Sequence, residues 1–273
     1  MPAPAAIRMG AVIYDPKVTV IWGIIQEYFE QQGVPLDLSL YADYDLQVDA
    51  LVEDRIDIAW NSPLAWLDAV RRTQGLCRAI AMRDTDRDRV SHIVVRRADG
   101  LDGVNALRGR TVGTGAVDSP QATLIPLEWL REQGLAPGEE FRVLNFNVGV
   151  GLHGDHVGGE LEAFRALQRG EVDASVMLDL NRSAWEKDGT LDASRYVVLG
   201  TTGLFDHCNF SVRESFAREG EAAFLGALFA MRYDDPRHRE MMDLEGLKEW
   251  LPGRTTGYDA LARAVEAVGF FRA

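Results

Sequence analysis

The 273-residue chain contains only two cysteines, Cys77 and Cys208, and no metal-type spacing joins them. A disulfide framework is therefore not expected. Long apolar runs are also missing, since no stretch reaches the ~20 apolar residues of a membrane span. We therefore expect no insertion into a membrane.

Basic residues are scarce as well, with 29 Lys and Arg against 42 Asp and Glu, which gives a formal net charge of −13. This excess of acid repels phosphate backbones and anionic lipids, so we expect no nucleic-acid partner. A small anionic ligand stays compatible with the charge, because backbone N–H groups can make a cleft locally attractive to anions.

The first residues, MPAPAAIRMG, lack the basic segment and the apolar segment of a secretory signal peptide. Taken as written, the sequence predicts a cytoplasmic protein. If a signal peptide had been removed, the prediction becomes a periplasmic protein, and only then is a transporter partner expected.

Strand-like and helix-like segments alternate along the chain, which predicts an α/β fold with mostly parallel sheets flanked by helices. In the first stretch the expected strands are 7–14, 36–41 and 56–60, and the expected helices are 18–32 and 46–54. In the second stretch the expected strands are 91–97, 111–115, 141–145 and 172–178, and the expected helices are 120–133 and 160–168.

One junction occurs twice, as ALVEDRIDIA at 50–59 and as ALQRGEVDAS at 166–175. Each is a helix end, a charged turn and an Ile/Val-Asp step into a strand. The repeat favours two similar lobes with a ligand in the crevice between them, although helix–turn–strand junctions also resemble one another in unrelated folds. We assign 1–95 plus 210–273 to lobe 1 and 96–209 to lobe 2.

Four motifs resemble, in the right order, the phosphate/phosphite/phosphonate-type periplasmic solute-binding proteins. They are RIDIAWNSPLAWLDA, SHIVVRRADGLDGVNALRGRTVGTG, DSPQATLIPLEWL and GGELEAFRALQRGEVDASVMLD. The resemblance covers about residues 7–260. It implies the type II periplasmic-binding-protein fold, with two lobes joined by two crossing strands near 93–97 and 209–212 and a hinge there.

The ligand-reading positions depart from this family. Its phosphonate binders carry Ser-Thr-Ser-Gly at the start of a second-lobe helix, where this chain has Ser119, Pro120, Gln121 and Ala122. Only the first hydroxyl remains, and proline removes an N–H donor. A Gly-Ser or Gly-His segment of the family is replaced by Gly-Gly-Glu160, whose carboxylate would repel a phosphonate. These departures predict a ligand other than a plain phosphonate.

Three helix starts combine a polar residue with proline, at 14–16, 61–63 and 118–120. Such helix N-termini offer free N–H groups to an acceptor. Plain capping is the more usual explanation for any one of them, but three in matching places favour a role in the cleft for at least two. The resemblance adds Asp179, an acid that faces the cleft in the family. The candidate ligand-binding residues are Tyr14, Asn61, Ser62, Ser91, His92, Ser119, Gln121, Thr123 and Asp179.

The segment HGDHVGGE places His153, His156 and Glu160 in one glycine-rich loop. Two histidines and a carboxylate can hold non-haem iron or zinc. Together with His207 they are also candidate acid–base groups of an active site. The alternative is a polar surface loop with solvated histidines.

Three functions therefore remain open. The first is a solute-binding protein that closes on a small polar or anionic molecule in the cleft. The second is a cytoplasmic enzyme on the same fold, using the His/carboxylate cluster with or without a divalent metal. The third is a partner-binding module with an idle cleft. The sequence does not decide whether the chain is an enzyme, and its cofactor is unknown.

Overall fold

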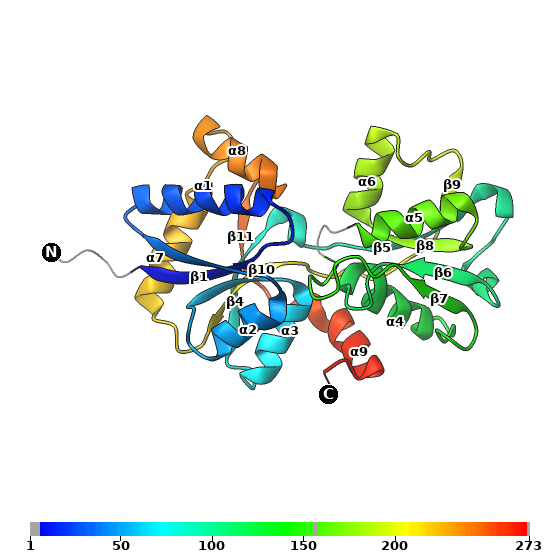
Figure 1. Ribbon diagram of the computed structural model, residues 1–273, viewed down its shortest axis with the longest axis horizontal. Coiled ribbons are helices and arrows are strands. Elements are labelled where there is room, and N and C mark those ends of the chain that lie inside the picture. Colours follow the sequence, from blue (N-terminus) through cyan, green and yellow to red (C-terminus); the bar gives the residue numbers. More distant parts are fainter. Residues whose placement is uncertain (1–5, 155–157, 272–273) are drawn as a thin grey trace. The chain divides into compact units, whose positions relative to one another are not determined.

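The computed structural model describes residues 6–154 and 158–271, which form two compact units. Unit 1 contains the residues up to Arg87 together with Asp206–Gly257. Unit 2 contains Asp88–Phe205 and the residues from Tyr258 onward. Each unit is built on its own β-sheet (Figure 1).

The sheet of unit 1 has six strands in the order β11-β4-β10-β3-β1-β2. Strand β1 pairs in parallel with β2 and β3, whereas β10 lies antiparallel between β3 and β4, and β11 pairs antiparallel with β4. The strands are β1 (Ile7–Val12), β2 (Leu36–Tyr41), β3 (Ile58–Asn61), β4 (Cys77–Arg83), β10 (Asn209–Arg213) and β11 (Trp250–Pro252).

Helices cover both faces of this sheet (Figure 1). Helix α1 buries one stripe, at residues 18, 21, 22, 25 and 29, which is the 3.6-residue spacing of an amphipathic helix. Its Trp22 and Phe29 pack with Phe210 and Phe224 in the main core. The helices are α1 (Lys17–Gln31), α7 (Arg218–Phe229) and α8 (Pro236–Glu245) around this core, and α2 (Tyr44–Val52) and α3 (Pro63–Arg72) across the sheet.

The sheet of unit 2 has five strands in the order β7-β6-β8-β5-β9. They are β5 (Ser91–Arg96), β6 (Thr111–Thr114), β7 (Arg142–Asn145), β8 (Ala174–Leu178) and β9 (Tyr196–Thr201). One face packs on helix α4 and the other on α5 and α6, so each has its own apolar cluster. These helices are α4 (Ile125–Glu132), α5 (Gly159–Arg169) and α6 (Asp179–Asp188).

The two units share one topology, which confirms the expectation of two similar lobes. In each unit, four strands alternate with three helices along the chain, and the sheet places these strands in the order second, first, third and fourth. One further strand, which runs in the opposite direction, lies between the third and the fourth. That inserted strand is β10 in unit 1 and β5 in unit 2. The repeated junction joins α2 to β3 and α5 to β8, which are equivalent places.

The repeated junction has one structural purpose in both units. Asp57 accepts a hydrogen bond from the backbone N–H of Arg8 at 2.9 Å and returns its own N–H to the Arg8 carbonyl at 2.7 Å. Asp173 does the same with Thr111, at 2.8 Å in each direction. Each aspartate thus ties the start of its third strand to the first strand.

Three features differ from the sequence-based expectation. Both sheets are mixed, because β10, β11 and β5 run against their neighbours. Strands β5 and β10 each stay inside one unit, and the chain passes between units after Arg87, Phe205 and Gly257, which makes three passages rather than two. The last helix, α9 (Asp259–Val268), packs on α4 in unit 2, whereas 210–273 had been assigned to lobe 1.

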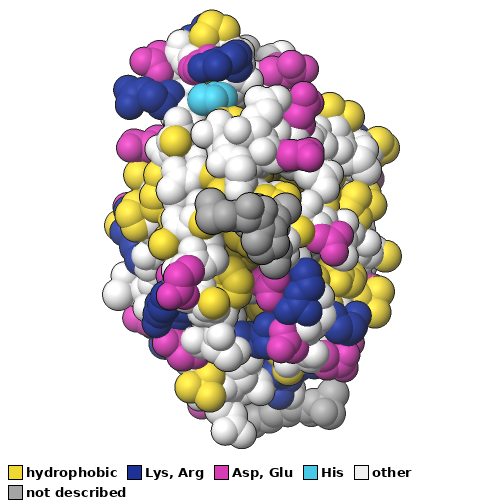
Figure 2. Space-filling view, turned by 90° about the vertical axis from the view of Figure 1, so that its left-hand side faces the viewer, with side chains coloured by type: hydrophobic (Ala, Val, Ile, Leu, Met, Phe, Trp, Pro, Cys, Tyr) yellow, Lys and Arg dark blue, Asp and Glu magenta, His cyan; other side chains and the backbone are white. Residues whose placement is uncertain are grey.

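The net negative charge does not collect into one patch on the face shown in Figure 2, where acidic and basic side chains lie interspersed. Of the helices that the structure describes, none combines the length and the hydropathy needed to span a bilayer.

Candidate functional site

Polar residues gather at the edge of the unit 1 sheet where its parallel strands end. Asn61 closes β3, Asp86 lies just after β4, and His207 lies just before β10, which starts at this same edge because it runs antiparallel. Tyr14 follows β1 and is half-buried against the core. We call this set the unit 1 edge.

Asn61 is the least satisfied donor of the unit 1 edge. It is fully buried, and its Oδ1 accepts a hydrogen bond from Gln47 Nε2 at 2.8 Å. Its Nδ2 has no hydrogen-bond partner among the described residues. The next residue, Ser62, caps helix α3 by accepting from the Ala65 N–H at 3.1 Å. In the part of the chain that the structure describes, an amide donor beside a helix N-terminus therefore has no acceptor.

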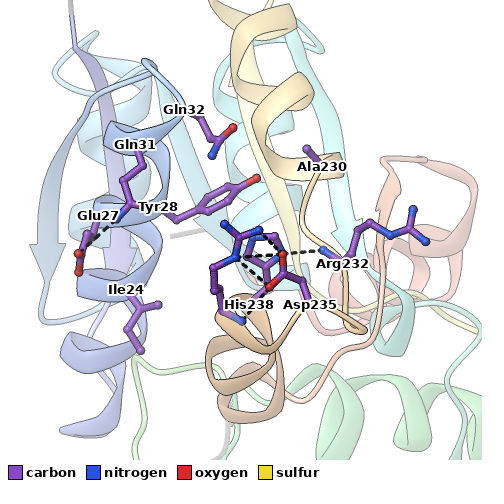
Figure 3. A pocket seen from close by; sticks show the side chains of 10 residues that line it. Ile24, Glu27, Tyr28, Gln31, Gln32, Ala230, Arg232, Asp235 and His238 are labelled. Carbon is purple, nitrogen blue, oxygen red and sulfur yellow. Dashed lines mark hydrogen bonds and ion pairs between the residues drawn. The ribbon is translucent and has the colours of Figure 1, made fainter.

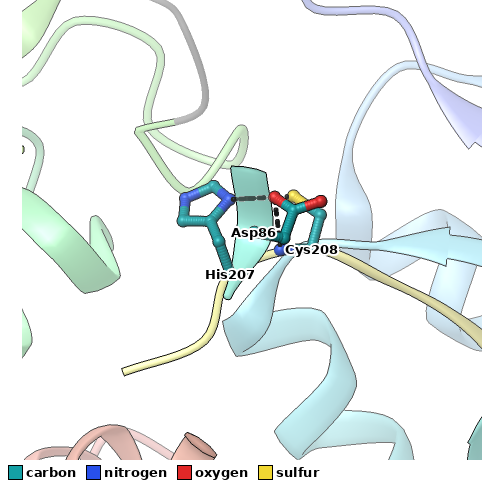
Figure 4. Close-up of side chains that lie close together, drawn as sticks. All are labelled: Asp86, His207 and Cys208. Carbon is teal, nitrogen blue, oxygen red and sulfur yellow. Dashed lines mark hydrogen bonds and ion pairs between the residues drawn. The ribbon is translucent and has the colours of Figure 1, made fainter. Parts of the chain in front are cut away.

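Asp86 is the centre of a buried ionic cluster, and Figure 4 shows it beside His207 and Cys208. The Arg83 guanidinium donates to both of its oxygens, at 2.7 and 2.8 Å, and also to Glu245 at 2.8 Å. Burial alone would raise the pKa of Asp86, but Arg83 outweighs burial and holds that pKa well below its usual range. His207 Nδ1 lies 3.5 Å from Asp86 Oδ1 and 3.1 Å from Cys208 Sγ.

In unit 2, the corresponding edge (the unit 2 edge) contains Ser119, Gln121, Glu160 and Asp179. Ser119 is buried and caps the helix by accepting from the Ala122 N–H at 3.2 Å. The first turn after it, Pro120–Leu124, is a π-helical turn that leads into α4. Ser91, at the start of β5, donates its hydroxyl to the Gln121 carbonyl at 2.6 Å and so fixes this turn.

Glu160 lies buried in the first turn of α5 among neutral donors. Its carboxylate accepts from Leu178 N–H at 2.8 Å, from Asn181 Nδ2 at 2.9 Å and from Gln121 Nε2 at 3.3 Å. This carboxylate thus links α5, the end of β8, α6 and the π-helical turn. Its geometry is that of a structural acceptor inside unit 2.

Two glycines of this edge permit a very close approach of backbone segments. A Cβ on Gly115 would lie 2.7 Å from Ala122 Cβ, and a Cβ on Gly159 would lie 2.8 Å from the Phe146 carbonyl oxygen. Real Cβ atoms do not come so close, so only glycine fits at either position. Gly159 therefore allows α5 to begin directly against the turn that follows β6.

At the unit 2 edge, three buried oxygens have no hydrogen-bond partner in the described part of the chain. They are Asp118 Oδ1, Thr123 Oγ1 and Asp179 Oδ1. Asp118 uses its other oxygen to accept from Gly151 N–H at 2.6 Å, and Asp179 uses its other oxygen to pair with Arg89 at 3.3 Å. Asp118 and Asp179 thus each have one carboxylate oxygen at this edge that accepts no hydrogen bond from the described residues.

The expected His/carboxylate cluster is not assembled among the described residues. His156 lies outside them. His153 is buried in a left-handed backbone conformation and Glu160 is engaged as described, both in unit 2, whereas His207 belongs to unit 1. The described donor atoms that lie within 4.8 Å of one another belong instead to Asp86, His207 and Cys208. The metal prediction for His153 and Glu160 therefore gains no support.

The remaining candidate, His92, contacts Thr201 Oγ1 through Nδ1 at 3.0 Å. Burial, followed by the nearby Arg182, lowers its pKa, which favours the neutral ring. His92 therefore acts mainly as a link between β5 and β9.

A surface pocket of about 470 Å³ lies elsewhere in unit 1, between α1 and the segment that leads into α8 (Figure 3). Tyr28 and His238 meet there edge to face, with ring centroids 5.0 Å apart. None of the residues singled out in the sequence lines this pocket, so it does not coincide with either edge.

Sequence reasoning missed four residues that build the two edges: Gln47, Arg83, Asp86 and Asn181. Arg83 carried a usable signal, because it ends a strand of mostly apolar residues and has an acid three residues later. A buried arginine requires such a partner. Gln47 and Asn181 carried none, since their partners are distant in sequence.

Two α/β units of one topology, each with polar residues and helix N-termini at the carboxyl ends of its strands, define a solute-binding protein of the type II periplasmic class. The chain belongs to the family of phosphonate periplasmic substrate-binding proteins of ABC transporters, whose model matches residues 12–258.

Solved structures agree on the fold. The chain is similar to PhnD1 from Prochlorococcus marinus in complex with methylphosphonate, with 15% identity, a TM-score of 0.72 and coverage of 97% of this chain and 98% of that one. It is similar to the aliphatic sulphonate binding protein SsuA from Escherichia coli, with 16% identity, a TM-score of 0.59 and coverage of 96% and 83%. An uncharacterized Haemophilus influenzae protein is 30% identical over 107 residues, 39% of this chain and 70% of that protein.

The family confirms the resemblance, the two-lobed fold and the first functional hypothesis, a binding protein for small molecules. It lends no support to the enzyme alternative or to a cytoplasmic location. The expectation that the ligand lies between two lobes stays a prediction.

Proposed function

We propose that this chain is the periplasmic binding component of an ABC transporter and that it captures a small oxyanion which also carries an amino group. Family membership supports the transporter and the periplasm. The single observation that carries the oxyanion is the fully buried Asn61 Nδ2 at the unit 1 edge, which has no acceptor among the described residues. A buried donor without an acceptor costs about 1–3 kcal/mol, which an anionic ligand oxygen would offset.

The amino group is proposed from the unit 2 edge. Asp118 and Asp179 each keep a buried carboxylate oxygen without a donor among the described residues. A purely anionic ligand would be repelled by these carboxylates, whereas an ammonium group would satisfy them. The substrate class is therefore an aminoalkyl phosphonate or an aminoalkyl sulfonate.

Isothermal titration and thermal shift with matched ligands test this proposal. The probes are methylphosphonate, 2-aminoethylphosphonate, ethanesulfonate and 2-aminoethanesulfonate. We expect the amino compound of each pair to bind more tightly and to raise the melting temperature by mass action. No binding of any probe at millimolar concentration would contradict the oxyanion, and equal affinity within each pair would contradict the amino group.

Asn61→Asp keeps the shape of the side chain and the bond from Gln47 but replaces the amide donor by a carboxylate. Loss of one hydrogen bond to a charged ligand costs about 1.5–3 kcal/mol, so we expect affinity for the best probe to fall roughly 10- to 100-fold. The control is Asn105→Asp, an exposed asparagine of unit 2 with the same charge change. Equal loss in both variants would indicate a general charge effect and not a contact by Asn61.

A further inference from the structure

We infer that Asp86, His207 and Cys208 form a zinc-binding site at the unit 1 edge, which is a property beyond the proposed transport function. The three side chains come from different parts of the chain, Asp86 after β4 and the other two before β10. All three are buried, and their donor atoms lie within 4.8 Å of one another. In Figure 4 the imidazole Nδ1, the thiol and the carboxylate point toward one another.

The spacing of these donors suits tetrahedral zinc. Zinc lies ~2.3 Å from sulfur and ~2.0–2.2 Å from nitrogen or oxygen, so two neighbouring ligand atoms stand about 3.4–3.6 Å apart. His207 Nδ1 is 3.5 Å from Asp86 Oδ1 and 3.1 Å from Cys208 Sγ. Zinc binding therefore needs shifts of only a few tenths of an ångström at the histidine, and the fourth position stays open to water.

Arg83 fits this site as the group that orients a ligand. Carboxylates that bind metals are themselves commonly held by hydrogen bonds, and Arg83 holds Asp86 through both of its oxygens. The backbone N–H of Cys208 adds a further bond to Asp86 Oδ1 at 3.2 Å. These bonds fix the carboxylate in the position at which it faces His207.

The charges around the site also balance when zinc is present. Arg83 contributes one positive charge, and Asp86 and Glu245 contribute one negative charge each, so these three side chains have a net charge of −1. Zinc adds two positive charges, and loss of the Cys208 thiol proton adds one negative charge. The loaded cluster is then neutral, which a buried position favours.

Titration of the intact protein with Zn²⁺ tests the site, with Co²⁺ as a spectroscopic probe. We expect one Zn²⁺ per chain and, with Co²⁺, the near-ultraviolet charge-transfer absorption of a thiolate ligand. Cys208→Ala and His207→Gln should each weaken Zn²⁺ binding at least ~100-fold, more than the loss of a supporting residue costs. Cys208→Ala should also abolish the charge-transfer band.

Two matched variants serve as controls. Cys77→Ala removes the other buried thiol and His238→Gln removes a histidine of the surface pocket, and both should leave Zn²⁺ binding unchanged. The proposal is overturned if the wild-type protein takes up no stoichiometric Zn²⁺, or if Co²⁺ gives no thiolate band. The wild-type measurements decide even where a variant fails to fold, and neither depends on the transported ligand.

Discussion

Units 1 and 2 share one topology and one strand-linking aspartate, yet their polar edges are stabilised in different ways. In unit 1, the buried carboxylates of Asp86 and Glu245 are held by the charge of Arg83. In unit 2, the buried carboxylate of Glu160 is held by two side-chain amides and a backbone N–H. The shared parts lie where strands must be aligned, and the different parts lie where the strands end.

This difference shows which positions the fold constrains. The aspartate that ties the first strand to the third serves the sheet itself, so both units carry it. The strand ends only have to be polar and satisfied, and many arrangements achieve this. The edges are therefore free to acquire tasks of their own, such as the ligand recognition and the zinc binding proposed above.

The largest effect is expected when the charge of the unit 1 cluster is removed. Arg83→Met leaves Asp86 and Glu245 buried without their cation, which should lower the free energy of unfolding by about 3–5 kcal/mol. Urea unfolding measures the change, and hydrogen exchange shows which unit has lost protection. Arg165→Met, which breaks an exposed pair with Glu162 in unit 2, should cost no more than ~0.5 kcal/mol. Similar losses of unfolding free energy in both variants would show that the buried ion pairs of Arg83 contribute no more to stability than an exposed pair.

Much of the fold could be predicted from sequence because it is encoded locally. Alternating apolar segments and the repeated junction at 50–59 and 166–175 indicated two similar α/β lobes, and the structure confirms them. The antiparallel direction of β10 and β5 could not be predicted from the sequence, since it depends on the point at which the chain enters each sheet. The position of α9 could not be read either, because its apolar stripe at Leu261 and Val265 would suit any exposed groove.

The site was less predictable, because its chemistry is set by contacts distant in sequence. The helix caps at Ser62 and Ser119 were expected from local pattern and are present. Glu160 looked like a free carboxylate beside two histidines, whereas its donors Leu178 and Asn181 come from 18 and 21 residues away. Proximity in sequence suggested a His/carboxylate cluster, whereas the described contacts of Glu160 are set by residues that are distant in sequence.

An intermediate effect is expected from the shared aspartate. Asp57→Asn weakens the charged bonds from Arg8, whose Nε and Nη2 donate to Asp57 at 3.1 and 2.6 Å, and should cost about 1.5–3 kcal/mol. Asp173→Asn should cost about 1 kcal/mol, because its side-chain cation Arg110 stands 3.3 Å away and its main bond comes from a backbone N–H. Thermal unfolding of both variants gives the comparison. A larger loss at Asp173 would mean that the backbone bond and not the ion pair provides most of the stability.

The smallest expected difference in stability concerns two equivalent glycines, Gly10 in β1 and Gly113 in β6, each in the first strand of the four that alternate with helices. A Cβ on Gly10 would lie 2.6 Å from Ile56 Cδ1, and a Cβ on Gly113 would lie 3.2 Å from Val172 Cγ2. Ile56 and Val172 are themselves equivalent, but the longer isoleucine fills the space that the valine leaves. Gly10→Ala should therefore cost about 1–2 kcal/mol through overpacking, and Gly113→Ala less than ~1 kcal/mol. The double variant Gly10→Ala with Ile56→Val should recover most of the loss in unit 1, since it recreates the pair found in unit 2. If Ile56→Val lowers the stability further instead, other neighbours limit the space beside β1. The two units would then be equivalent in backbone topology but not in side-chain packing.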